Sequence, residues 1–260
     1  MVHLPEPFGA VYVTLIGLVV GSFLNVCIYR LPHGLSIVRP GSRCPSCKTP
    51  IRWYQNVPVL SWFLLRGRCR DCRARISPRY PLVEASTGAL FVATLLVIEA
   101  VWVLPAYLLF AATTLVLVLT DFDHKRIPNR ILYPATVAGT VLLTAGAAAD
   151  GTLAALPRAL AGGGIFFGIL LIIALVARGG FGMGDVKLAV LLGTFLAFQS
   201  WDTLWSGIFL AFLIGGVVSL LLLITRRKGR KDAIPFGPPL IIGAWAALAW
   251  GEALVSWYLG

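Results

Sequence analysis

Eight apolar runs, most of them long enough to cross a lipid bilayer, dominate this sequence. They cover 8–28, 82–101, 105–121, 131–148, 155–177, 186–200, 203–225 and 236–257. An α-helix rises about 1.5 Å per residue, so roughly 20 apolar residues span the ~30 Å of hydrocarbon in a membrane. The pattern predicts an all-α polytopic membrane protein with about eight transmembrane helices. The sixth run is the shortest, so seven full spans is the alternative.

Composition agrees with this class and excludes others. Apolar residues make up 58% of the 260 residues, and charged residues reach only 13%, about half the ~25% of a soluble domain. Soluble, disordered and collagen-like chains are therefore excluded. The first run is not expected to be a cleavable signal, because residues 1–9 contain no Lys or Arg and so lack a basic leading region.

Positive charge is unevenly distributed among the loops. The chain has 22 Lys and Arg against 11 Asp and Glu, and the segment from Arg30 to Arg79 holds 11 of the 22. The loops 122–130 and 226–231 are also basic, and with eight spans all three lie on one face, which we expect to be cytoplasmic. Both termini would then lie outside, and Arg158 is the exception to the pattern. The charge thus reports orientation, and nucleic acid is not an expected partner.

The segment 29–80 is too polar to cross a membrane and carries a four-cysteine motif. Its cysteines are spaced C-x2-C-x21-C-x2-C, at Cys44, Cys47, Cys69 and Cys72. Two such pairs offer four thiolates, the set that structural Zn2+ prefers, and the metal would stabilise a domain with little apolar core. The alternative is a redox pair, since Cys44-Pro-Ser-Cys47 is similar to a thioredoxin-type motif. Cys27 lies in the first apolar run and is expected to be a packing residue.

Two aspartates lie at the ends of apolar runs, where ionisable groups are candidates for function. Asp121 ends the third run, and Asp185 precedes the sixth within Gly182-Met183-Gly184-Asp185. By the predicted topology both lie at the cytoplasmic ends of their helices, so they could meet and share a proton as a coupled dyad. The alternative is a pair of interfacial residues bound to Lys125, Arg126 or Lys187. Asp123 competes with Asp121 for the first position.

Together these segments resemble the prepilin peptidases, the type IV leader peptidases among the G-x-G-D intramembrane aspartyl proteases. The resemblance rests on six segments in order along the chain. They are Gly21-Ser22-Phe23-Leu24-Asn25-Val26 with Arg30-Leu31-Pro32, the four-cysteine loop, 76–84, Asp121 with Ile127-Pro128-Asn129, the G-x-G-D run at 182–185, and Ile234-Pro235-Phe236-Gly237-Pro238.

The resemblance implies that Asp121 and Asp185 are the catalytic pair, and that Asp123 is not. It implies cleavage of the basic leader from type IV prepilins and type II secretion pseudopilins, in a bacterial inner membrane. Because the four-cysteine loop is present, it also implies N-methylation of the new N-terminus with S-adenosylmethionine. Our candidates for the methyl-donor site are Asn25, Arg30, Glu84 and Gly88.

The predicted organisation has three parts: a first transmembrane helix (1–28), a cytoplasmic zinc domain (29–80) and a transmembrane protease core (81–260). Gly164 and Gly168 form a G-x-x-x-G pair in the fifth run, where we expect close helix packing. Two other classes of function remain open. A proton-coupled transporter with a structural zinc loop would also use membrane-edge aspartates, and a zinc-dependent scaffold would need only the cysteines. Membrane lipids are expected partners in each case, and the sequence does not fix the oligomeric state.

Overall fold

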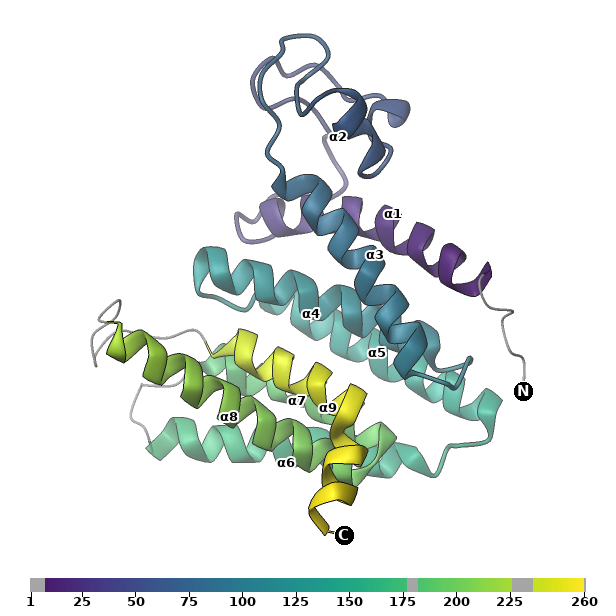
Figure 1. The fold of residues 1–260 in the computed structure, drawn as a ribbon, viewed down its shortest axis with the longest axis vertical. Helices are drawn as coiled ribbons and strands as arrows, with labels where there is room; N and C mark the ends of the chain where they lie inside the picture. The colour runs from purple at the N-terminus through teal and green to yellow at the C-terminus, as the bar shows by residue number, and fades with distance from the viewer. Residues whose placement is uncertain (1–7, 177–181, 226–235, 260) are drawn as a thin grey trace. The chain divides into compact units, whose positions relative to one another are not determined.

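The computed structural model describes residues 8–176, 182–225 and 236–259. In these ranges the chain is built of helices, loops and turns, with no strand (Figure 1). The all-α class predicted from the sequence is therefore confirmed. The chain divides into two compact units, Met1–Leu104 and Pro105–Gly260, which we call unit 1 and unit 2. The three-part division of the sequence stays a prediction.

Unit 1 contains two long helices that bracket the polar segment. Helix α1 (Phe8–Arg30) leads into a loop region with the short helices η1 (Trp53–Gln55) and α2 (Leu60–Leu64), and α3 (Arg79–Val97) follows. Glycines bring α1 and α3 together. A Cβ at Gly17 would lie 2.8 Å from Gly88 Cα, and one at Gly21 would lie 2.7 Å from Glu84 Cα. Only residues without a side chain permit so close an approach of two helices. Both ends of the loop region are thus held by one tight helix pair.

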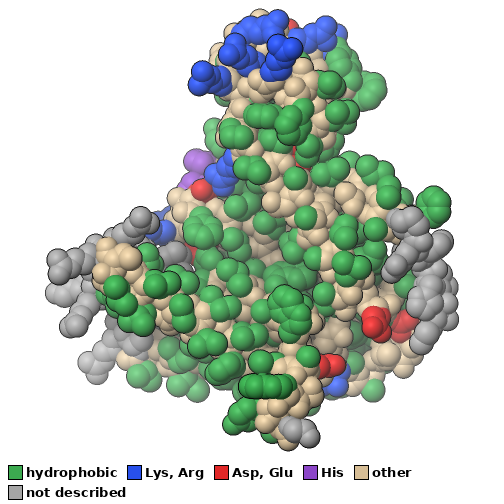
Figure 2. Space-filling model, viewed as in Figure 1, with side chains coloured by type: hydrophobic (Ala, Val, Ile, Leu, Met, Phe, Trp, Pro, Cys, Tyr) green, Lys and Arg blue, Asp and Glu red, His purple; other side chains and the backbone are tan. Residues whose placement is uncertain are grey.

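The loop region carries the positive charge of unit 1. Figure 2 shows Lys and Arg side chains gathered on the segment between α1 and α3. The described basic loop at 122–130 lies in unit 2, whereas the predicted basic loop at 226–231 lies outside the described residues. The assignment of these loops to the cytoplasm stays a prediction.

Unit 2 is a helical assembly around one central helix. Its elements are α4 (Leu104–His124), α5 (Asn129–Asp150), α6 (Ala155–Val176), α7 (Met183–Gln199), α8 (Trp201–Ile224) and α9 (Gly237–Leu259). Helix α7 packs against α5, α6, α8 and α9, and 12 of its 17 residues are buried. Because other helices cover α7, its burial comes from protein and not from lipid. A central position therefore explains why this run can be shorter than the others.

Seven helices in the described ranges are long and apolar enough to cross a membrane, and α7 is not among them. The shortest predicted run, 186–200, corresponds to α7, which is only 17 residues long. The start of α7 follows closely after the end of α6 in the sequence. The other end of α7 is bound by Arg158, which lies near the start of α6. Arg158 donates hydrogen bonds to the carbonyls of Ala197, Phe198 and Gln199 at 2.6–2.7 Å. The basic residue that broke the charge pattern is therefore a cap on the C-terminus of α7.

The close packing predicted for Gly164 and Gly168 is wrong. A Cβ at either position would meet nothing within 4 Å. Gly162 and Gly163, on another face of α6, instead lie against Gly193 and Thr194 of α7. The sequence pattern identified a helix with small residues, but apolar residues surround that helix on all sides, so the pattern did not indicate the contacting face.

Candidate active site

Asp121 and Asp185 are buried in unit 2, one at each of two helix ends. Asp121 lies in the last turn of α4, which ends where Lys125 adopts φ 50° and donates its N–H to the Asp121 carbonyl at 2.8 Å. Asp185 lies in the first turn of α7, which begins at Met183, directly after Gly182. The two side chains are 5% and 8% exposed. A carboxylate is costly to bury without a partner, so both positions are of the kind that function retains.

The start of α9 shows how closely the two carboxylates approach each other. A Cβ built on Gly237 would lie 2.9 Å from Asp121 Oδ2 and 3.4 Å from Asp185 Oδ1. A side chain at this one position would therefore meet both carboxylates, and α4, α7 and α9 meet at this point. In the sequence Gly237 stands out only as part of a motif, and its role beside the aspartates was not predicted. Its signal was a glycine at a predicted helix start, between Phe236 and Pro238.

Among the described residues, Asp121 and Asp185 form no ion pair with Lys125, Arg126 or Lys187, as the interfacial alternative would require. Asp121 Oδ2 is buried and has no hydrogen-bond partner among the described residues. Lys187 Nζ lies 3.5 Å from Asn129 Oδ1 and 5.7 Å from the centre of the Tyr133 ring. Lys125 and Arg126 are exposed, and so is Asp123. The structure thus brings Asp121, and not Asp123, beside Asp185.

A second contact fixes the loop that follows α4 against the start of α7. A Cβ at Gly184 would lie 3.1 Å from Ile127 Cβ, and Asn129, two residues later, begins α5. The Ile127-Pro128-Asn129 segment and the G-x-G-D run are therefore packed together. A side chain at Gly184 would press on this loop and shift the turn that carries Asp185.

In unit 1 the four cysteines of the loop region form one cluster. All four Sγ atoms lie within 4.8 Å of one another. The distances from Cys44 to Cys72 and from Cys47 to Cys69 are 3.8 and 4.0 Å between Sγ atoms. Four thiolates at Zn–S distances of ~2.3 Å in a tetrahedron would have their sulfurs ~3.8 Å apart. The donor set and its spacing fit a zinc ion, and the cluster could bind a metal.

The two cysteine pairs have the same backbone conformation. Lys48 and Arg73, each directly after the second cysteine of its pair, have φ 61° and 60°. Their N–H groups donate to the carbonyls of Cys44 and Cys69 at 3.0 and 3.1 Å. The repeat shows two matching knuckles, as the zinc hypothesis requires. A redox pair would need only one of them.

Hydrogen bonds also favour the thiolate form in the first knuckle. The hydroxyl and the backbone N–H of Thr49 lower the pKa of the Cys47 thiol to about 6. The backbone N–H of Cys47 likewise lowers the pKa of Cys44. Metal ligation requires deprotonated sulfur, so these bonds prepare the ligands.

Comparisons with known proteins cover both units. The Bacterial Peptidase A24 N-terminal domain matches residues 15–98, and the Type IV leader peptidase family matches residues 108–223. A prepilin leader peptidase/N-methyltransferase from Aeromonas hydrophila is 34% identical over 95% of this chain and 92% of its own length. The same-named protein of Pseudomonas aeruginosa is 35% identical over 94% and 91%, and that of Neisseria gonorrhoeae is 31% identical over 98% and 96%. This chain belongs to the prepilin leader peptidase family. No solved structure matches the chain.

Membership of the prepilin leader peptidase family gives each site its place in the chain. The leader peptidase match contains Asp121 and Asp185, and the N-terminal domain match contains all four cysteines. Membership of this family does not support the transporter or the scaffold hypothesis, and nothing in the described residues favours either one.

Within this family framework, three of the four methyl-donor candidates make contacts that hold unit 1 together. Asn25 Nδ2 donates to the Tyr80 carbonyl at 3.1 Å. The buried Glu84 carboxylate accepts the Val59 N–H at 2.6 Å, and Gly88 is packed against α1. Arg30 differs, because it is at the end of α1 and lines a cavity. The structure thus brings Asn25, Glu84 and Gly88 into the α1–α3 pair, and leaves Arg30 on the wall of a cavity.

Proposed function

We propose that this chain is a membrane aspartyl endopeptidase that removes the leader peptide from prepilins and pseudopilins, and that it N-methylates the new N-terminus. The observation that carries the proteolytic part is the convergence of Asp121 and Asp185 on Gly237 in a buried position. Two adjacent carboxylates share a proton, and this allows acid and base chemistry on one peptide bond.

A dyad that shares one proton holds one ionised and one protonated carboxyl, and each would have its own role. The ionised carboxylate takes a proton from water, whose oxygen then attacks the scissile carbonyl carbon. The protonated carboxyl donates a hydrogen bond to the carbonyl oxygen and stabilises the charge that develops there. When the C–N bond breaks, the leaving amine takes up a proton from the dyad, and the pair returns to its starting state.

The proposed cofactors belong to unit 1. Cys44, Cys47, Cys69 and Cys72 would hold one Zn2+ in a closed structural site, with no open position for catalysis. S-adenosylmethionine would supply the methyl group, which passes to the neutral α-amine as the carbon–sulfur bond breaks and the amine loses a proton. The proposed location is a bacterial inner membrane, with the loop region and the aspartates on the cytoplasmic face. This orientation follows from the basic loops.

The test is a reconstitution with purified full-length protein in detergent micelles. A precursor pilin is incubated with and without S-adenosylmethionine carrying a labelled methyl group. We expect a size shift of the pilin in both samples, and label on the mature N-terminus only when the donor is present. Absence of any size shift from folded protein would contradict the proposed proteolysis, and a shift without label would contradict the proposed methylation.

A further inference from the structure

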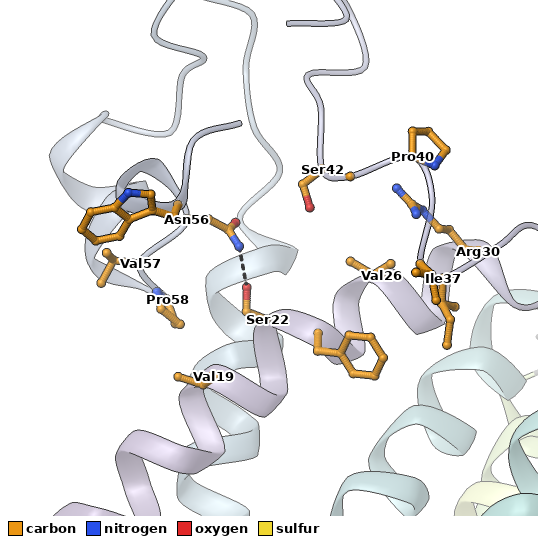
Figure 3. A pocket seen from close by; sticks show the side chains of 14 residues that line it. Val19, Ser22, Val26, Arg30, Ile37, Pro40, Ser42, Asn56, Val57 and Pro58 are labelled. Carbon is orange, nitrogen blue, oxygen red and sulfur yellow. Dashed lines mark hydrogen bonds between the residues drawn. The ribbon is translucent and has the colours of Figure 1, made fainter. Parts of the chain in front are cut away.

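A cavity of about 430 Å3 lies in unit 1, between the second half of α1 and the loop region (Figure 3). Helix α1 contributes residues from Val19 to Arg30, and the remaining wall comes from 37–42 and 53–58. This volume is within the usual range of small-molecule sites. The proteolytic chemistry proposed above does not use any of these residues.

Polar groups converge on the cavity from both walls. Arg30 Nη1 donates to the Ser36 carbonyl at 3.0 Å, which uses one of the five guanidinium N–H groups. Figure 3 shows Arg30 extending toward the loop that carries Pro40 and Ser42. On another side, Asn56 Nδ2 donates to Ser22 Oγ at 3.4 Å. The cavity therefore offers one cation, a carboxamide and hydroxyl groups.

Large apolar side chains of the loop region are exposed at the same cavity. Trp53 is 84% exposed and Val38 is 76% exposed, and both line it. Covering exposed indole and aliphatic groups with a ligand removes apolar surface from water, which favours binding. An indole face also suits a purine ring or a sulfonium cation.

A strained residue next to the cavity wall indicates that the wall is held in place. Val59, directly after the lining residues Val57 and Pro58, has φ 61°. This conformation is unfavourable for a β-branched side chain and persists only where surrounding contacts impose it. The contact here is the buried Glu84 carboxylate, which accepts the Val59 N–H at 2.6 Å. Glu84 of α3 thus positions the wall.

We propose that this cavity binds S-adenosylmethionine, with the methionine carboxylate on Arg30 and the adenosine against Trp53. The proposal rests on the proposed N-methylation and names its binding site. The ligand carries one carboxylate, one ammonium, one sulfonium and a purine, so it needs one cation beside neutral polar and apolar surface. Glu84 then acts as a positioning residue through Val59, without touching the ligand.

A second cavity in unit 1 has the wrong chemistry for this ligand. It measures about 510 Å3 and is lined by Arg66, Arg68 and Arg75 together with Trp62. Three guanidinium groups would repel a ligand with net positive charge. The second cavity thereby supplies a control position for the experiment.

Two matched pairs of variants test the proposal in the full-length protein. Gly41 lines the cavity, and a Cβ there would meet nothing within 4 Å, so Gly41→Trp can place an indole in the space whereas Gly41→Ala leaves it open. Arg30→Gln removes the cation, and Arg75→Gln removes one from the second cavity. The readout is the Kd for tritiated S-adenosylmethionine by equilibrium dialysis, with thermal unfolding measured without ligand as the check on folding.

We expect Arg30→Gln to weaken binding at least about tenfold, the loss typical of a hydrogen bond to a charged group. Gly41→Trp should weaken binding at least as much, because the indole would occupy the space of the ligand. Gly41→Ala and Arg75→Gln should stay within about twofold of the unaltered chain. Unchanged binding in folded Gly41→Trp and Arg30→Gln would overturn the assignment of the cavity while leaving methylation intact. No binding by the unaltered chain would overturn the proposed methylation itself. A phospholipid that co-purifies with the unaltered chain and is lost in Gly41→Trp, with donor binding unchanged, would make the cavity a lipid site and overturn the proposal.

Discussion

The cysteine cluster and the aspartate pair are built in different ways. The cluster comes from one loop region, in which two knuckles with the same hydrogen bonds and the same positive φ together supply four sulfurs. The aspartate site takes one carboxylate from α4, one from α7 and a glycine from the start of α9. Residues of a single loop region build the first site, whereas packing among three helices of unit 2 builds the second. The two sites should therefore respond differently to the same kinds of change.

The largest expected effect is at the aspartates. Asp121→Asn and Asp185→Asn should each lower cleavage of a precursor pilin by more than about 10³-fold, because the members of a catalytic unit act together. Folding should persist, since a carboxamide has nearly the same shape as a carboxylate. The matched control is Asp123→Asn, two residues along and exposed, which should retain most of the activity. Cleavage at a normal rate by either main variant would exclude the dyad.

The next effect concerns the metal. The purified protein should hold about one Zn2+ per chain, and Cys44→Ser or Cys69→Ser should lose it. Hydrogen exchange should then rise across 29–80 and change little in unit 2, because only the loop depends on the ion. Cys27→Ala is the control, as Cys27 is buried in α1 and outside the cluster. A disulfide mapped between Cys44 and Cys47 in metal-free protein would support the redox alternative.

Gly237 offers a smaller and more selective test of the assembled site. In Gly237→Ala the new methyl group would meet Asp121 Oδ2 at 2.9 Å, so the carboxylate must move by a few tenths of an ångström or more. Moving the end of a side chain costs little stability, but misplacing a catalytic group lowers the rate, here by about 10- to 100-fold. Gly216→Ala in α8, where a Cβ meets nothing within 4 Å, should leave the rate unchanged. Thermal unfolding and pilin cleavage, measured on both variants, separate the two effects. Equal activity of the two variants would show that Gly237 does not support the pair.

The smallest effect is expected where the two activities separate. Glu84→Gln keeps an oxygen that can accept the Val59 N–H, so methylation should fall only several-fold, while cleavage stays within about twofold. Gly88→Leu, which presses on Leu18 and Thr14 of α1, should impair methylation more. Asp185→Asn supplied with an already cleaved pilin should still transfer a labelled methyl group. If this folded variant fails on cleaved pilin, the two activities share a site.

Much of this architecture could be predicted from the sequence, because it depends on features that are contiguous in the chain. Apolar runs give the helices, and the spacing of Cys44 to Cys72 gives the metal cluster. Asp121 and Asp185 stood out because the chain has only 11 Asp and Glu and ionisable groups beside a membrane are candidates for function. Gly237 and Arg158 did not stand out as site residues, since their roles depend on contacts with distant segments. Apolar patterns give the length of a membrane helix but not its rotation, and this is why packing was assigned to Gly164 when Gly162 makes the contact.

Because its C-terminal end is capped, α7 sets the position of Asp185 along its axis. Arg158 fixes the end at Gln199 through three carbonyls, and Asp185 lies 14 residues back along the same helix. At 1.5 Å per residue the separation is about 21 Å, roughly 9 Å less than the ~30 Å thickness of the hydrocarbon layer. The cap thus fixes the position of the Asp185 carboxylate along the axis of α7, measured from the end at Gln199. One residue more or less in α7 would displace it by about 1.5 Å and rotate it by about 100° relative to Asp121, so the length of this helix matters to the proposed catalytic pair as much as the aspartate that it carries.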